Sequence, residues 1–252
     1  MTRWIARGLM LLPLLSLMGC GGTLQESKRE GSPDFPKAKG EYDQANYLDA
    51  IPDFKAYIEQ FPGTDKTDDA LYYLGRSYIQ ERDYALASAQ FDRLLRDFPT
   101  SPLQADALLE QARCDDLQSH PASLDQTETL QALTRYNQFV EQYPEHPRLA
   151  EAKARVVVLR DRLAEKLLRS GRLYSKLHRE RAAEFYLRKL LTDYADSKWV
   201  PEANRLLGEV LARQGKKAEG DEARKGASPS SGAEPKPKPD QPPRLQASEA
   251  PG

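Results

Sequence analysis

The sequence predicts an all-α protein, a superhelical solenoid of about five helix hairpins. Three observations predict this fold: a short phrase that recurs four times, apolar residues at helical spacing between its copies, and charges of both signs interleaved with them. The chain has 252 residues, of which 30% are charged and 39% hydrophobic, and 37 basic against 38 acidic side chains leave a net charge of −1. Interleaved charges are typical of solvated helix faces, and near neutrality gives no electrostatic basis for binding nucleic acid.

The first element is predicted to be a lipoprotein signal peptide over residues 1–19. Arg3 and Arg7 precede a mostly apolar run at 9–17, and Gly19 stands before Cys20. This order is typical of lipoprotein signals, and about nine apolar residues fall well short of the ~20 that span a bilayer. We expect a mature chain that begins at Cys20, carries covalent lipid (palmitate) there and no other cofactor, and continues as a flexible tether over 20–34. A permanent membrane-spanning anchor is the alternative.

A helical repeat domain is predicted over residues 35–225. Its recurring phrase is an aromatic residue, usually a proline, a small polar residue or histidine three positions after the aromatic, and an alanine nine positions after it. The copies are Phe61-Pro62, Thr64, Ala70; Phe98-Pro99, Ser101, Ala107; Tyr143-Pro144, His146, Ala152; and Tyr194-Ala195, Ser197, Ala203. Successive aromatics are 37, 45 and 51 residues apart, which favours helix hairpins with insertions over other repeat architectures.

The second unit shows the repeat most clearly. From Gly75, the offsets to Tyr78, Ala87, Phe91 and Pro99 are 3, 12, 16 and 24, and these positions resemble the tetratricopeptide (TPR) signature. The small residues Gly75 and Ala87 would let two antiparallel helices approach closely. The residues expected to fill the space between units are Leu71, Leu74, Phe91 and Leu94.

The ends of these helices are predicted from their polar residues and prolines. Pro99 should end one helix, and Thr100 or Ser101 should accept hydrogen bonds from backbone N–H groups of the next, with Pro102 just inside it. The equivalents of Ser101 are Thr64, His146 and Ser197. The paired carboxylates Asp68-Asp69 and Asp115-Asp116 are expected at helix starts or in loops, where negative charge is favoured or solvated.

Two departures from the repeat are expected in the second half. Residues 115–123 should lengthen a turn into a loop, either as a tolerated insertion or as a loop that carries contacts. A long helix should run from Arg148 to about Arg172, where Gly171 and Ala183 restore the hairpin offset of 12. The first helix is expected at about 36–47, and the last two at 199–213 and 216 to about 224.

The C-terminal tail, 226–252, is predicted to be disordered with extended polyproline character. Seven of its 27 residues are proline, including the alternating run Pro235-Lys236-Pro237-Lys238-Pro239. Such a segment has too little apolar surface to offset the entropy of ordering. A PxxP-type ligand role is the alternative.

The sequence offers no recognisable catalytic or metal-binding motif. Its histidines, His120, His146 and His178, are far apart, and there is no HExxH, CxxC, glycine-rich phosphate loop or GxSxG. Once Cys20 carries lipid, Cys114 has no disulfide partner and is expected to be a small buried residue rather than a nucleophile. We therefore expect neither an enzyme nor a metal protein.

The inner surface of a hairpin solenoid is the expected binding surface, because stacked first helices present it to extended segments or partner domains. Tyrosine and arginine carry much of the energy at interfaces, although either tyrosine of the second unit could instead pack between helices. The candidate binding residues are Asp69, Tyr72, Tyr73, Arg76 and Gln80 in the second unit and Asp106, Glu110 and Arg113 in the third.

The order of these features resembles the BamD family, the lipoproteins of the β-barrel assembly machinery. The most discriminating part is Leu159-Arg160-Asp161-Arg162-Leu163-Ala164 in the long helix, and residues 190–197 resemble that family's closing repeat. The resemblance covers roughly 35–214. It implies a non-catalytic scaffold, lipid-anchored on the periplasmic face of the outer membrane, and Gly21 fits because the aspartate retention signal after the cysteine is absent.

The partners that the resemblance implies are BamA-like insertase, other BAM components and unfolded outer-membrane proteins. The C-terminal hairpins, 174–213, would dock the POTRA domains of BamA, and the N-terminal hairpins would meet substrates. A CpoB-like periplasmic TPR adaptor that works with Tol-Pal or cell-wall synthesis is the alternative, and a lipoprotein that activates a peptidoglycan enzyme is another. Recovery of BamA, or of Tol or cell-wall proteins without it, would separate them.

Overall fold

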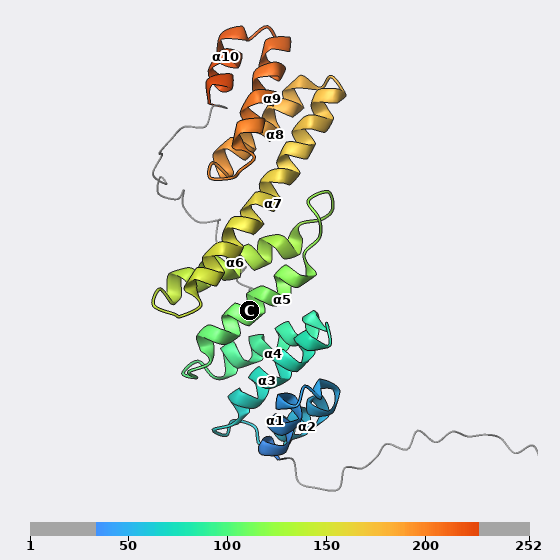
Figure 1. Ribbon diagram of the computed structural model, residues 1–252, viewed down its shortest axis with the longest axis vertical. Coiled ribbons are helices and arrows are strands. Elements are labelled where there is room, and N and C mark those ends of the chain that lie inside the picture. The colour runs from blue at the N-terminus through green and yellow to red at the C-terminus, as the bar shows by residue number, and fades with distance from the viewer. Residues whose placement is uncertain (1–33, 227–252) are drawn as a thin grey trace, which may run out of the picture. The chain divides into compact units, whose positions relative to one another are not determined.

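The computed structural model describes residues 34–226 (Figure 1). The predicted signal peptide, the lipid-bearing cysteine, nearly all of the tether and the tail beyond Gly226 lie outside these residues. Within 34–226 every regular element is a helix, which confirms the predicted all-α fold. The ten helices are α1 Phe35–Asp43, α2 Tyr47–Gln60, α3 Thr67–Gln80, α4 Tyr84–Asp97, α5 Gln104–Gln118, α6 Thr127–Gln142, α7 Leu149–Lys176, α8 Glu180–Asp193, α9 Val200–Arg213 and α10 Lys217–Lys225.

The helices form five consecutive hairpins, as predicted. Each helix packs on the one before and the one after it, so that α1/α2, α3/α4, α5/α6, α7/α8 and α9/α10 are the pairs (Figure 1). Three clusters of buried apolar residues run along this stack, one over α1–α5, one over α5–α7 and one over α7–α9. None of the helices in the described part is long and apolar enough to span a bilayer.

Small residues allow the close contact within each pair. A Cβ added at Gly75 would lie 2.7 Å from Cζ of Phe91, and one at Gly171 would lie 2.8 Å from Cγ of Leu187. The apolar residues expected to fill the space between units, Leu71, Leu74, Phe91 and Leu94, are all buried. The large side chain of each second helix thus fills the space that the missing side chain of the first leaves open, which confirms the predicted role of Gly75.

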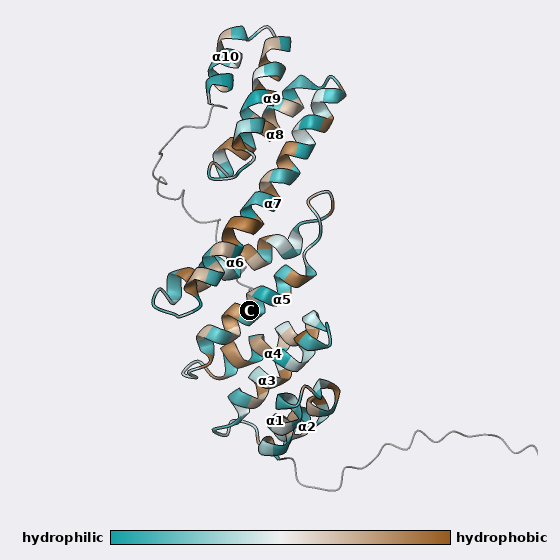
Figure 2. Ribbon diagram, in the orientation of Figure 1, coloured by the Kyte–Doolittle hydropathy of each residue, from teal (hydrophilic) through white to brown (hydrophobic). Residues whose placement is uncertain are grey.

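The last pair makes its contact differently. A Cβ at Gly208 of α9 would lie 2.8 Å from the carbonyl oxygen of Gly220 in α10, so backbone meets backbone there. Helix α10 is largely hydrophilic in Figure 2 and buries only Gly220.

In two copies of the phrase, the serine three positions after the aromatic links successive units. Ser101 Oγ accepts a hydrogen bond from the N–H of Leu103 at 3.1 Å and donates one to Asp68 Oδ2 at 2.6 Å. Ser197 Oγ likewise accepts from the N–H of Trp199 at 3.3 Å and donates to Asp161 Oδ1 at 2.7 Å. Each serine therefore accepts a hydrogen bond from a backbone N–H, as expected. That N–H belongs to the residue just before the helix, however, and not to the helix itself.

Two boundaries differ from expectation near these phrases. Pro102 stands before α5, which begins at Gln104, because the serine shapes a turn that ends before the helix starts. The first helix ends at Asp43, and Ala45, with φ of +62°, makes the turn to α2 instead of continuing the helix to 47.

The prediction for Asp115 and Asp116 was wrong. Helix α5 continues to Gln118, so both carboxylates lie in its last turn and not in a loop. Asp115 is buried against Arg135 of α6, and Asp116 Oδ2 accepts from Nε of Arg155 in α7 at 2.7 Å. Arginines from the two following helices offset the unfavourable placement of these charges at a helix C-terminus.

The inserted loop therefore runs over 119–126. The buried side chain of Gln126 holds it together, because its amide nitrogen donates to the carbonyl oxygens of Pro121 at 2.9 Å and Asp125 at 2.8 Å. Thr129 donates to the other end of the same amide at 3.0 Å.

Helix α7 belongs to two repeats. Its 28 residues pack on α6 through the first half and on α8 through the second half (Figure 1). In the middle, Arg160 is paired with Asp196, donates to the carbonyl of Asp193 at 3.0 Å and lies over the ring of Tyr194. The motif at 159–164 thereby ties α7 to the turn between α8 and α9.

Candidate functional site

The candidate site begins with a cluster of aromatic rings from α1–α3. Tyr73 lies between Tyr42, Phe54 and Phe35, with ring centroids 5.0, 6.1 and 6.4 Å away. Lys39 Nζ lies 4.7 Å from the centroid of Tyr73. Tyr73 is half-buried, so an aromatic surface with a cation beside it is partly accessible here.

Tyr72 and Arg76 form the next part of the site, one helical turn apart on α3. The ring of Tyr72 packs against Phe91 at 5.9 Å and is only 8% exposed. Arg76 lies over the rings of both Tyr42 and Tyr72, at 5.7 and 5.9 Å. Tyr72 therefore serves the packing of the second hairpin as well as the site.

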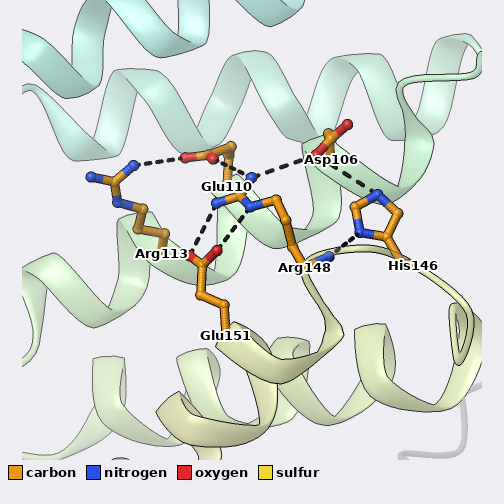
Figure 3. Close-up of polar contacts among 6 residues, drawn as sticks. All are labelled: Asp106, Glu110, Arg113, His146, Arg148 and Glu151. Atoms are coloured by element: carbon orange, nitrogen blue, oxygen red, sulfur yellow. Dashed lines mark hydrogen bonds and ion pairs between the residues drawn. The ribbon is translucent and has the colours of Figure 1, made fainter.

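Charged residues from α5 and the start of α7 continue the site (Figure 3). Glu110, whose side chain is 3% exposed, receives a hydrogen bond from Arg148 at 2.8 Å and an ion pair from Arg113 at 3.3 Å. Arg148 also lies 3.5 Å from Asp106 and donates to Glu151 at 2.9 Å.

His146 completes this network at its edge. Its Nδ1 accepts from the N–H of Arg148 at 3.2 Å, and its Nε2 lies 3.9 Å from Asp106 (Figure 3). His146 is the residue three positions after the aromatic in the third copy of the phrase. It lies beside an acidic residue in the first helix of the preceding hairpin, as Ser101 and Ser197 do.

Burial and charge together set the electrostatics of the site. Burial, and secondly the charge of Glu110, raises the pKa of Tyr72 to about 12. Burial disfavours the charged form of Arg148, but hydrogen bonds to Glu151 and Glu110 outweigh it and raise the pKa of Arg148. The hydrogen bond from Arg148 holds the pKa of Glu151 below its ordinary value. The site thus keeps a neutral phenol beside a charged, paired network.

The structure brings most of the predicted residues together. Tyr72, Tyr73, Arg76, Asp106, Glu110 and Arg113 lie on neighbouring turns of α3 and α5, and the charges of Asp106 and Glu110 act on Tyr72. Asp69 and Gln80 lie at opposite ends of α3, where Asp69 is paired with Lys66 at 2.8 Å and Gln80 is exposed. Peptide or partner binding by these eight residues stays a prediction.

Three residues of the network, His146, Arg148 and Glu151, were missed as site residues. The sequence did contain one sign of them. They belong to the third copy of the recurring phrase, which leads into the first helix of the next hairpin, and first helices were expected to form the binding surface. Their partners on α5 are about 40 residues away in the chain, so the sequence alone does not show the pairing.

No group of three or more His, Cys, Asp and Glu side chains within 34–226 is arranged to hold a metal ion. Cys114 is fully buried, and burial raises the pKa of its thiol to about 12, so the thiol stays protonated near neutral pH. This agrees with its expected role as a small buried residue.

Charge is divided unevenly along the described residues. Residues 34–164 contain 15 Lys and Arg against 23 Asp and Glu, whereas residues 165–226 contain 15 against 10. The aromatic and acidic site lies in the first part, and the second part, from the middle of α7 to the end of α10, carries a net positive charge.

Comparison with known proteins places these features in a family. A family model described as YfiO, outer membrane lipoprotein, matches residues 30–225. An outer membrane protein assembly factor BamD from Haemophilus influenzae is 26% identical over 221 residues, covering 83% of this chain and 84% of its own. The BamD of Caulobacter vibrioides is 25% identical over 198 residues, covering 77% of this chain, and the aligned part spans 65% of its own length.

Solved structures with similar folds are TPR proteins. A TPR repeats protein from Bacteroides fragilis shares 16% identity and a TM-score of 0.45 over 76% of this chain and 84% of its own. A thermophilic TPR protein of Thermus thermophilus shares 16% identity and a TM-score of 0.39 over 76% of this chain and 87% of its own. These likenesses concern the helical repeat alone.

Proposed function

Because the chain belongs to the YfiO, or BamD, family of outer membrane lipoproteins, we propose that it is a non-catalytic scaffold for the assembly of outer-membrane β-barrel proteins. The observation that carries this proposal is the extent of the family match, which includes all five hairpins. The relatives are named as assembly factors, and the candidate site is a surface of rings and paired charges suited to binding a protein segment.

The proposed division of labour follows the uneven charge. The aromatic surface of α1–α3 binds apolar and aromatic side chains of unfolded barrel substrates. The basic hairpins α7/α8 and α9/α10 dock a BamA-like insertase through its POTRA domains. Aromatic rings make apolar contacts with many different substrate sequences. Arginines form hydrogen bonds of defined geometry, which suit a folded partner.

The proposed anchor is lipid on Cys20, which holds the hairpins at the periplasmic face of the outer membrane. Cys20→Ala should release the protein from the membrane fraction or leave it unprocessed. An unchanged lipidated product would contradict the anchor.

The main test is purification of the full chain from its native membrane in mild detergent. A BamA-like protein and other BAM components should co-purify. Recovery of Tol or cell-wall proteins without a BamA-like protein would overturn the proposal in favour of a periplasmic adaptor.

Matched arginine substitutions test the docking surface. Arg169 stands two residues before Gly171, in the register that Tyr73 holds before Gly75, and it is paired with Glu165 four residues earlier. Arg96 on α4 is similarly exposed and paired with Asp92 at the same spacing. Arg169→Glu should lower recovery of the insertase, whereas Arg96→Glu should leave it unchanged.

A photo-crosslinking residue tests the substrate surface. Gln80 is exposed at the end of α3, and Gln60 is exposed at the end of α2. The probe at position 80 should capture unfolded barrel protein in preference to the probe at 60. Equal capture at both would argue against a substrate surface on α3.

A further inference from the structure

A pocket of about 390 Å³ opens where the start of α6, the middle of α7 and the end of α8 meet. Leu163 and Leu167 of α7, Leu130 of α6 and the ring of Tyr194 supply its apolar lining. It lies outside the candidate site, which is built on α1–α3, α5 and the start of α7.

The pocket follows from the two departures from the repeat. Helix α7 spans two units, so α6 packs on its first half and α8 on its second, and a gap is left beside its middle. The inserted loop supplies one wall through Asp125 and Gln126, and the hydrogen bonds of Gln126 hold that wall in shape.

Hydrogen-bond donors surround the apolar lining. Lys166 lines the pocket and already donates to a backbone carbonyl, that of Leu124. Lys189 lines the opposite side, where it is paired with Asp193 at 2.7 Å. Asp125 and Asp193 line the pocket as well, so its apolar floor lies between two lysines and two carboxylates. Such a lining suits a ligand that offers apolar rings, carbonyl acceptors and positively charged side chains.

The chain itself contains such a ligand beyond Gly226. In Pro235-Lys236-Pro237-Lys238-Pro239, three of five residues lack a backbone N–H. Alternating prolines favour the polyproline II conformation, which has no internal hydrogen bonds and presents its carbonyls outward. The family match ends at residue 225, so this segment is a feature of this chain outside the matched region.

The point where the described chain ends lies near the pocket. The carbonyl of Gly226 accepts from Asn204 Nδ2 at 3.0 Å. Asn204 is about one turn, ~6 Å, inside α9, and α9 begins six residues after Tyr194 of the pocket. Residues 227–234 can extend to roughly 26 Å, which is enough for the proline and lysine run to reach the pocket.

We propose that residues 235–239 bind the pocket between α6, α7 and α8 of the same chain as an extended polyproline segment. Prolines pack on Leu130, Leu163 and Tyr194, and their carbonyls accept from Lys166 and Lys189. Short proline-rich segments bind such apolar grooves at low entropic cost because their free conformation already resembles the bound one.

Lysine-specific crosslinking of the full chain in detergent, read by mass spectrometry, tests the proposal. A short amine-reactive crosslinker should join Lys236 and Lys238 to Lys166 and Lys189. Leu130→Arg should lower the yield of these links about fivefold, because the new side chain fills the pocket and repels the lysines. Leu86→Arg on α4 is the matched control, since Leu86 is 48% exposed and Leu130 is 49% exposed.

A second variant, with changes in the tail only, tests the proposal even if Leu130→Arg does not fold. Replacing Pro235, Pro237 and Pro239 with serine leaves both tail lysines in place and should lower the same links to a similar extent. Links that form equally in all variants, or that spread over lysines across the whole surface, would overturn the proposal. Links found mainly between isotope-labelled and unlabelled copies would overturn it in favour of binding between two chains.

Discussion

The second and fifth hairpins use a glycine at the same register of the first helix, but they close in different ways. In the second, Gly75 faces the ring of Phe91, and α4 also buries Ala87 and Leu94. In the fifth, Gly208 faces the backbone of Gly220, and α10 buries no large side chain. The same small residue therefore permits apolar burial in one hairpin and, in the other, a close approach of two backbones covered by the exposed side chain of Arg224.

The difference predicts that stability is concentrated toward the N-terminal hairpins. Fully burying a phenylalanine contributes roughly 1.5–3 kcal/mol, whereas α10 has no comparable group. The fifth hairpin should open at lower free energy than the second, since local opening follows the number of buried apolar contacts. Four substitutions test this difference between the hairpins.

Phe91→Ala should have the largest effect. Phe91 is fully buried, so its loss leaves a cavity and should lower the free energy of unfolding by about 3–5 kcal/mol. Denaturant unfolding measures this change. Arg224→Ala is the counterpart in α10, where Arg224 packs over Gly208, and an equally large loss there would show that the two hairpins do not differ.

Gly75→Ala should come next. The added Cβ would lie 2.7 Å from the ring of Phe91, and the resulting shift should cost about 1–3 kcal/mol. Gly40→Ala in α1 is the control, since no atom lies within 4 Å of its added Cβ, and it should stabilise by roughly 0.5–1 kcal/mol. Equal losses at both positions would mean that helix flexibility, not the contact with Phe91, decides the result.

Tyr72→Phe should have a smaller effect that grows at high pH. At neutral pH the loss of a buried hydroxyl beside Arg76 should cost about 0.5–1.5 kcal/mol. Burial raises the pKa of Tyr72 to about 12 from an ordinary value near 10, so the stabilisation from its neutral phenol is full below about pH 10 and is lost as the pH rises toward 12. The variant should show a shallower alkaline loss of stability, and identical pH profiles would argue against a buried neutral phenol.

Gly208→Ala should have the smallest effect on the whole molecule. Its Cβ would lie 2.8 Å from the Gly220 carbonyl, which cannot move as a flexible side chain can, so α10 should separate from α9. Hydrogen exchange of amides 217–225 should speed up, while global stability changes by about 0.5 kcal/mol or less. A cooperative loss of protection in α3 and α4 as well would show that the hairpins unfold as one unit.

The sequence predicted those parts of the fold that depend on local spacing. The offsets from Gly75 to Ala87 and Phe91 identified a contact that the structure confirms, and apolar steps through Leu159 and Leu163 predicted the long helix. The predicted ends of α9 and α10 were within a residue of the observed ones. Helices can be predicted from periodic apolar residues because the spacing of these residues shows which face of the helix is buried.

Long-range pairing of charges was not predictable from spacing. Asp115 and Asp116 were expected at a helix start or in a loop, where negative charge is favoured or solvated, yet they lie at the end of α5 and are paired with Arg135 and Arg155 of later helices. Arg148 was missed for the same reason, since its partner Glu110 is 38 residues earlier. The aromatic and charged residues were predicted as a group. The network of contacts that joins them could not be predicted, because it depends on how three helices are placed in space.

The continuity of α7 has a mechanical consequence. Helix α7 packs on α6 of the third hairpin and on α8 of the fourth as one unbroken rod, and Arg160 near its middle is paired with Asp196. Pulling or twisting the fourth hairpin must therefore rotate the third with it. Such a rotation would act on the half-buried Arg148, which stands one residue before α7 begins and is paired with Glu110 of α5.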